Sequence, residues 1–212
     1  MTTYFSALSL AAALLVAAPV VAADGGKTAK AKAPAQLTVD TKASNLAWVG
    51  EKVTGKHNGT VMLQGGTVEV NAGRLTGGMF TMDMGSVVVE DLKDPSYNAK
   101  LVGHLKSDDF FGIEKHPTAT FKITSAAPIK GAAAGKANYT VNGDLTIKGI
   151  TNRISLPATV QMSGTGLTAT GTTKIDRTKY DIKYGSGSFF DNLGDKAISN
   201  DFVITFNVVA KK

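Results

Sequence analysis

Residues 139–162 read YTVNGDLTIKGITNRISLPATVQM, and this stretch decides the fold. Within residues 139–147 every second position is apolar or glycine, and the positions between them are polar. After Lys148-Gly149 the same alternation returns and runs through residues 154–162. Successive side chains of a β-strand point to opposite sides, so each half predicts a strand with one apolar face. The glycine turn between the halves predicts an antiparallel hairpin.

The period of two extends on both sides of this hairpin. Residues 118–124 and 202–209 alternate in the same way. Weaker strands fit residues 46–53, 59–64, 67–71, 74–84 and 167–176, with turns expected at Asn58-Gly59, Gln64-Gly65-Gly66 and Asn71-Ala72-Gly73. About eight or nine amphipathic strands joined by short turns favour a closed antiparallel barrel, which leaves no open sheet edge.

One segment breaks the alternation. Within residues 91–111, Leu101 and Leu105 lie four positions apart, which is the spacing of one helical face. We predict a short helix there, near a barrel mouth. Phe110 and Phe111 follow it directly. Two interpretations of this pair stay open: a plug that packs the helix onto the barrel, or part of a ligand entrance.

The apolar faces of the strands are expected to point into the barrel. They combine aromatic and large aliphatic residues, namely Trp48, Val61, Leu63, Phe80, Met82, Phe121, Ile123, Leu145, Ile147, Phe202, Ile204 and Phe206. Other positions on these faces are small, namely Gly50, Gly78, Ala119, Gly143, Ala158, Ala169 and Gly171. Small inward residues leave volume unfilled, and an eight-stranded barrel has room for one small ligand. This pattern favours an apolar ligand, with an interior filled by side chains as the alternative.

The residue types exclude several chemistries. The chain has no cysteine, so disulfides, thiolate catalysis and cysteine zinc sites are excluded. The three histidines, His57, His104 and His116, are far apart and lack metal-ligand spacing. No nucleophile elbow is present. We therefore expect no enzyme, no metal and no covalent cofactor.

The N-terminal residues predict export. Residues 4–23 are uncharged and rich in alanine, leucine and valine, which is typical of a secretory signal. We assign residues 1–23 to a signal peptide, with an uncleaved anchor as the alternative, and residues 24–36 to a flexible linker. The expected location is periplasmic or secreted. The net charge of +6 is carried by scattered lysines, so no nucleic-acid partner is expected. Transient contact with a membrane surface and a homodimer stay open.

Several motifs in series carry a family resemblance. They read WVGEKVTGKHNG at residues 48–59, GGMFTMDM at 77–84, GHLKSDDFF at 103–111, HPTATF at 116–121 and NGDLTIKGIT at 142–151, followed by a basic segment at 177–183. In this order and spacing the chain resembles the YceI-like family over residues 37–210. The resemblance implies an all-β, eight-stranded antiparallel lipocalin-like barrel with one short helix, spanning residues 37–212. It also implies a bound isoprenoid quinone or polyprenyl lipid, with no established reaction.

The interior pattern and the resemblance together give the candidate ligand-binding residues. They are Trp48, His57, Val61, Leu63, Phe80, Met82, Leu101, Leu105, Phe110, Phe111, Phe121, Ile123, Leu145 and Ile147. His57 is included as a polar contact to a quinone head group, with structural hydrogen bonding as the alternative. The basic segment is expected to form a charged rim on a strand. A ligand-free barrel that acts through its surface in an envelope stress response, and an enzyme acting on a quinone or lipid, are the alternative functions.

Overall fold

The computed structural model of the protein describes Met1 and residues 33–212. The expected signal peptide, residues 1–23, therefore lies outside the described residues, as does most of the expected linker. Strand β1 (Ala35–Val39) begins within the last two residues assigned to that linker.

The described residues form a closed, eight-stranded antiparallel barrel, as the alternation predicts. Its strands are β1, β2 (Asn45–Lys52), β3 (Gly55–Asn71), β4 (Arg74–Val89), β5 (Thr118–Pro128), β6 (Tyr139–Ile147), β7 (Ile150–Met162), β8 (Gly166–Asp176) and β9 (Ile198–Lys211). β1 and β2 share one position in the ring, because each pairs with a different part of β3 and β9. The ring closes through the long pairing of β3 with β4.

The hairpin of residues 139–162 is confirmed. β6 pairs with β7 in continuous register from Tyr139 opposite Ala158 to Ile147 opposite Ile150. Lys148 and Gly149 form the turn with φ of 50° and 73°. Positive φ at both central residues is the turn geometry that matches the twist of two antiparallel strands.

Two of the expected turns were wrong. Asn58-Gly59 and Gln64-Gly65-Gly66 both lie inside β3, which is a single strand. A Cβ at Gly59 would lie 1.8 Å from the carbonyl oxygen of Val88, and one at Gly66 would lie 2.7 Å from that of Met79. These glycines therefore permit the close approach of β4 and do not turn the chain. A register shift between Leu63 and Gly65 bends the strand in the same region.

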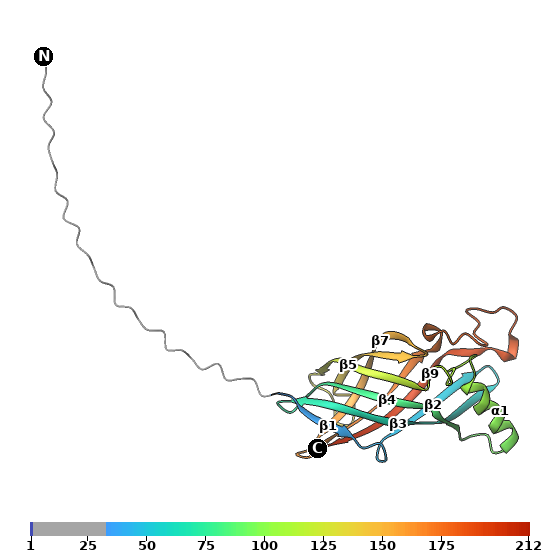
Figure 1. Ribbon diagram of the computed structural model, residues 1–212, viewed down its shortest axis with the longest axis horizontal. Helices are drawn as coiled ribbons and strands as arrows, with labels where there is room; N and C mark the ends of the chain where they lie inside the picture. The colour runs from blue at the N-terminus through green and yellow to red at the C-terminus, as the bar shows by residue number, and fades with distance from the viewer. Residues whose placement is uncertain (2–32) are drawn as a thin grey trace. The chain divides into compact units, whose positions relative to one another are not determined.

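The predicted helix is present as α1 (Pro95–Lys106). The side chain of Asp94 caps it by accepting hydrogen bonds from the backbone amides of Ser96 (2.8 Å) and Tyr97 (3.1 Å). Leu105 is its buried residue. Figure 1 shows α1 at one end of the barrel, opposite the end that carries β1 and the C-terminus. Among the described residues, no helix has the length and apolar character needed to span a membrane.

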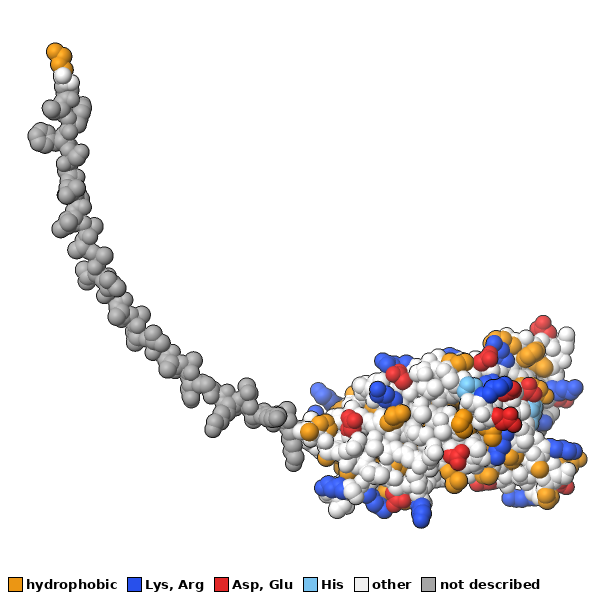
Figure 2. All heavy atoms as spheres, viewed as in Figure 1, with side chains coloured by type: hydrophobic (Ala, Val, Ile, Leu, Met, Phe, Trp, Pro, Cys, Tyr) orange, Lys and Arg blue, Asp and Glu red, His pale blue; other side chains and the backbone are white. Residues whose placement is uncertain are grey.

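The buried core has two parts, one at each end of the barrel. The β1 end is packed by a cluster that includes Leu37, Val39, Val68, Leu75, Leu167 and Ala210. The α1 end is packed by a cluster that includes Met84, Val87, Leu105, Phe110, Ile175 and Ile182. On the face seen in Figure 2, acidic and basic side chains are interspersed.

Candidate functional site

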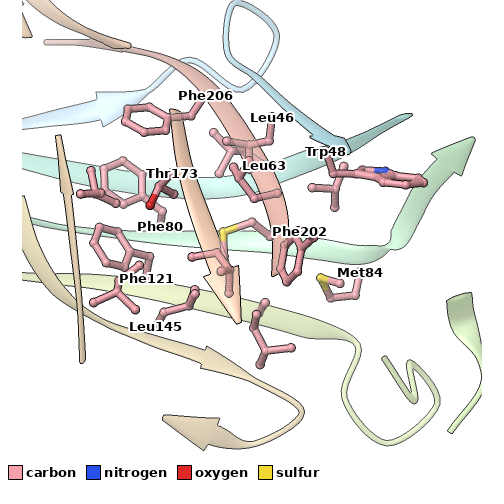
Figure 3. A pocket seen from close by; sticks show the side chains of 18 of the residues that line it. Leu46, Trp48, Leu63, Phe80, Met84, Phe121, Leu145, Thr173, Phe202 and Phe206 are labelled. Atoms are coloured by element: carbon pink, nitrogen blue, oxygen red, sulfur yellow. The ribbon is translucent and has the colours of Figure 1, made fainter. Parts of the chain in front are cut away.

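An apolar cavity of about 250 Å³ lies inside the barrel, between the two core clusters. Every strand except β1 contributes to its wall. Figure 3 shows Trp48 and Met84 towards one end of the lining and Phe206, Phe80 and Phe121 towards the other. The wall consists almost entirely of carbon, which suits a hydrocarbon ligand.

The cavity is long and narrow. On β8 its lining runs from Leu167 to Ile175, which is eight residue steps. At about 3.3 Å per step this is roughly 26 Å along the strand, or roughly 20 Å along the axis for a strand tilt of about 40°. Because so small a volume extends over this length, the cavity fits an extended chain better than a compact ring system.

Both ends of the cavity are covered by packed side chains. At the β1 end, Leu37, Val39 and Ala210 are buried behind the lining. At the α1 end, Phe110 is 8% exposed and lines the cavity. Its ring lies 4.9 Å from that of His104 in an edge-on arrangement. Phe110 therefore packs α1 onto the barrel, as the plug interpretation expects. Phe111 is half-buried and also lines the cavity.

Most of the predicted binding residues lie together in the cavity wall. The lining includes Trp48, Val61, Leu63, Phe80, Met82, Leu105, Phe110, Phe111, Phe121, Ile123, Leu145 and Ile147. His57 and Leu101 are not part of it. The Nδ1 atom of His57 lies 2.8 Å from Oδ2 of Asp91, at the outer start of β3. Leu101 packs from α1 against the core cluster of the α1 end.

The comparisons with known proteins agree with this geometry. A family profile for the YceI-like domain matches residues 37–210. This chain belongs to the YceI-like family.

Curated relatives of this chain include proteins that carry the name UPF0312. One from Vibrio parahaemolyticus is 34% identical over 113 residues, which cover 50% of this chain and 57% of that protein. One from Staphylococcus aureus is 39% identical over 92 residues, covering 38% and 46%. The chain thus spans about half the length of the curated relatives it matches.

Two solved structures are similar to this YceI-like protein. BcnA of Burkholderia cenocepacia has a TM-score of 0.60 and 27% identity, covering 82% of this chain and 99% of that one. A polyisoprenoid binding domain from Saccharophagus degradans, implicated in plant cell wall breakdown, has a TM-score of 0.57 and 18% identity, covering 82% and 97%. At 18% identity, the similarity to the Saccharophagus degradans domain shows only that the two proteins share a fold.

Glycines in the wall of this YceI-like barrel are covered by aromatic rings. An added Cβ would meet ring carbons in four such pairs: 3.0 Å for Gly59 and Trp48, 3.1 Å for Gly66 and Phe80, 2.4 Å for Gly143 and Phe121, and 2.4 Å for Gly171 and Phe206. The expectation that Gly143 and Gly171 leave volume unfilled was therefore wrong. The free volume lies between the rings, whose positions the glycines permit.

The basic segment 177–183 does not form a rim on a strand, which corrects the sequence-based expectation. Its first residues form the 3-10 helix η1 (Arg177–Tyr180), which Asp176 caps through the amide of Thr178 at 3.0 Å. Arg177 is 4% exposed. Its guanidinium donates to the carbonyl oxygens of Ser199 (2.8 Å), Ile182 (2.8 Å), Tyr184 (2.8 Å) and Ile198 (3.1 Å). Burial lowers the pKa of Arg177 below its ordinary value.

Tyr180 is buried beside this segment. Burial raises the pKa of its hydroxyl to about 12, so the side chain stays neutral at physiological pH. The hydroxyl has no hydrogen-bond partner within the described part of the chain. Arg177 and Asp201 are the ionisable residues of the cavity lining. The guanidinium of Arg177 already donates hydrogen bonds to backbone carbonyl oxygens, including those of Ile182 and Ile198. The wall of the cavity is therefore apolar over most of its length.

Some lining residues were missed by the sequence reasoning. Val87 lies in the last part of β4, beyond the strand predicted for residues 74–84. Met84 is the last residue of that predicted strand and continues the alternation of Phe80 and Met82. Ile175 continues the period of two on β8 and could have been found by extending that pattern. Ile182 comes from the loop after η1, within the segment 177–183 for which a strand was expected, so its place in the cavity wall was not predicted.

Proposed function

We propose that this protein binds one isoprenoid lipid, a quinone or a polyprenyl chain, inside the barrel. It carries or stores this lipid in the cell envelope and does not alter it chemically. The observation that carries the proposal is the long, carbon-lined cavity between the two core clusters.

The chemistry of the wall favours a hydrocarbon chain over a polar ligand. A polar group placed among Leu63, Phe80 and Leu145 would lose its hydrogen bonds to water and find no replacement there. An apolar chain gains about 25 cal/mol for each Å² that leaves water. Filling the cavity also restores the contacts that its lining atoms lack. The cavity therefore selects for length and apolar character.

The family supports the same class of ligand. The structure from Saccharophagus degradans is described as a polyisoprenoid binding domain, and its barrel matches most of this chain. Carried to this protein, that description favours an isoprenoid over other apolar chains. Its location in the envelope rests on residues 1–23 of the sequence.

The proposal is tested by the lipid that the protein carries in its own cells. We would purify the protein from that source, extract it with organic solvent and analyse the extract by mass spectrometry. A polyprenyl or quinone species near one molecule per chain is expected. A clean extract, together with no uptake of either lipid class in vitro, would sink the proposal and favour a ligand-free barrel that acts through its surface.

A carrier of this kind must also exchange lipid with a membrane, and the α1 end has a surface suited to it. We call Tyr97, Tyr184, Phe189 and Phe190 the aromatic rim; they are 65%, 45%, 49% and 50% exposed. All four belong to α1 or to the segment between η1 and β9. Aromatic side chains are favoured at the membrane–water interface. We propose transient contact of this end with a phospholipid bilayer, the source of the lipid.

A further inference from the structure

The pairing of β2 with β9 is interrupted near the α1 end. Gly50 lies opposite Phe202, but the next paired residue of β2, Lys52, lies opposite Ile198. Glu51 on one strand therefore faces residues 199–201 on the other. Such an irregularity breaks the local ladder and leaves backbone groups unpaired across the two strands.

Most backbone groups at the start of β9 have partners away from β2. The exception is next to β9, where the carbonyl oxygen of Ala197 accepts from the amide of Val53 at 3.1 Å. The amide of Ile198 donates to the carbonyl oxygen of Gly185 at 2.7 Å. The carbonyl oxygens of Ile198 and Ser199 both accept from Arg177. The amide of Asp201 donates to Oγ of Ser199 at 3.1 Å. Because these groups are already satisfied, few hydrogen bonds must break for β2 and β9 to separate here.

A surface depression lies at this interruption. It has a volume of about 300 Å³ and is lined by Glu51, Lys52, Val53, Ala197, Ile198 and Ser199. Ile198 and Ser199 also line the inner cavity. The depression lies on the outer side of the barrel wall and the cavity on the inner side. Ile198 and Ser199 line both of them.

We propose that the lipid enters the barrel sideways through this interruption, which we call the β2–β9 gap, and that its polar head group stays in the depression. The proposal rests on the proposed function. In the described part of the chain, buried side chains cover the ends of the cavity, Leu37 and Ala210 at one and Leu105 and Phe110 at the other. Opening the gap requires separation of the Lys52–Ile198 pair at the end of the β2–β9 ladder and loss of the hydrogen bond from the Val53 amide to the Ala197 carbonyl oxygen.

The depression also indicates the class of head group. It offers one acid, Glu51, one base, Lys52, and the hydroxyl of Ser199. An anionic head group such as a diphosphate would be attracted by Lys52, but the carboxylate of Glu51 beside it would repel it. A neutral head group with a hydroxyl or carbonyl oxygen can accept from the Ser199 hydroxyl without that repulsion. The expected ligand is therefore an isoprenoid alcohol or quinone.

A reversible disulfide across the β2–β9 gap, which we call the gap staple, tests whether the lipid enters there. The chain has no cysteine, so Lys52→Cys with Ile198→Cys creates a single disulfide. Residues opposite each other in antiparallel strands have Cα atoms about 4.5–5.5 Å apart, which a disulfide spans. The probe is retinol, an isoprenoid alcohol that quenches tryptophan emission, and Trp48 in the cavity wall is the one tryptophan. Stopped-flow quenching is measured for the oxidised and the reduced form of the same protein.

We expect retinol to enter at least about tenfold more slowly when the staple is oxidised, with full recovery on reduction. The control is Thr146→Cys with Thr151→Cys, whose hydroxyls lie 2.7 Å apart in the β6–β7 hairpin; its oxidation should not change the rate. Equal rates for both forms of the gap staple would overturn the entrance while leaving the lipid-binding function intact. No binding of retinol to the wild-type protein, together with no uptake of a quinone or a polyprenyl lipid, would overturn both.

The head-group assignment is tested with a probe of the same skeleton and a different charge. Retinoic acid is anionic at neutral pH, whereas retinol is neutral. We expect retinol to bind at least about fivefold more tightly to the wild-type protein. Equal or tighter binding of retinoic acid would overturn the neutral head group.

Discussion

The ring of Phe206 lies over Gly171, its direct partner across the β8–β9 ladder. A Cβ at Gly171 would lie 2.4 Å from Cζ of that ring and 2.5 Å from the carbonyl oxygen of Pro157. Partners in an antiparallel pair share one face of the sheet, so the missing Cβ makes room for the ring beside the cavity. Glycine at this position therefore fixes how far Phe206 extends into the cavity.

Gly171→Ala should destabilise the barrel. The added methyl group must displace either the Phe206 ring or the β7 backbone, and overpacking of this kind costs about 1–3 kcal/mol. Urea denaturation measures the change in the free energy of unfolding. The matched control is Gly164→Ala in the β7–β8 turn, where no atom lies within 4 Å of the added Cβ. Equal stability of the two variants would contradict the close packing of Phe206 on Gly171.

Contacts between a glycine and the neighbouring strand explain why two of the turns predicted from the sequence were wrong. The period of two identified the strands because it follows from the alternation of side chains within one strand. The roles of Gly59 and Gly66 depend on the neighbouring strand, and a single strand carries no signal of its register with another. The sequence alone does not distinguish a glycine that permits close approach of a neighbouring strand from a glycine in a turn. The sequence therefore favoured turns where β3 continues.

The same limit applies to the candidate site. Leu63, Phe80 and Leu145 follow the alternation of regular strands, so their place in the cavity wall could be predicted. Arg177 and Ile182 follow β8, where a strand was expected over residues 177–183 but the chain turns into η1 and a loop. The expected strand therefore did not indicate where their side chains point. The burial of Arg177 depends on four carbonyl groups that only the folded chain brings together.

Filling the cavity should reduce lipid binding without a loss of stability. Ala169 lines the cavity and is only partly buried, so Ala169→Leu places its added atoms in the free volume. We expect binding of retinol to weaken at least about tenfold, or about 1.4 kcal/mol, with an unchanged or higher Tm. Fluorescence titration and thermal unfolding measure the two effects. The control, Thr170→Leu, faces outwards on the same strand and should bind as the wild type does. Undiminished binding by Ala169→Leu would place the ligand outside the cavity.

Arg177→Lys should destabilise the protein strongly. Lysine keeps the charge but cannot reach four carbonyl oxygens with one planar group, so buried acceptors lose their partners. We expect a loss of about 3 kcal/mol in the free energy of unfolding, measured by chemical denaturation. Arg153→Lys is the control, because Arg153 is exposed and pairs with Asp144 at 2.8 Å on the surface. A loss no larger than that of the control would show that the four hydrogen bonds of Arg177 contribute little.

The Asp91 carboxylate should make stability depend on pH. Burial alone would raise the pKa of Asp91, but the Asn58 amide and the His57 side chain more than offset this and lower it. A lowered pKa in the folded state means that the stabilisation is present above the unfolded pKa, near 3.9, and is lost as the pH falls through the folded value. In Asp91→Asn, stability should fall less between pH 5 and pH 2 than in the wild type. Identical profiles for Asp91→Asn and the wild type would rule out this role of Asp91.

The aromatic rim should bind the protein to membranes. Phe189 and Phe190 are adjacent and half-exposed, and their rings can enter the interfacial region of a bilayer. The wild-type protein should float with phosphatidylcholine vesicles in a density gradient, and the combined change Phe189→Ser and Phe190→Ser should reduce the floating fraction severalfold. Retinol binding in the absence of vesicles should not change, because neither residue lines the cavity. The control is Ile129→Ser, which removes an exposed apolar residue next to β5 at the β1 end. Equal losses in the double variant and the control, or no flotation of the wild type, would show that the rim does not contact a bilayer.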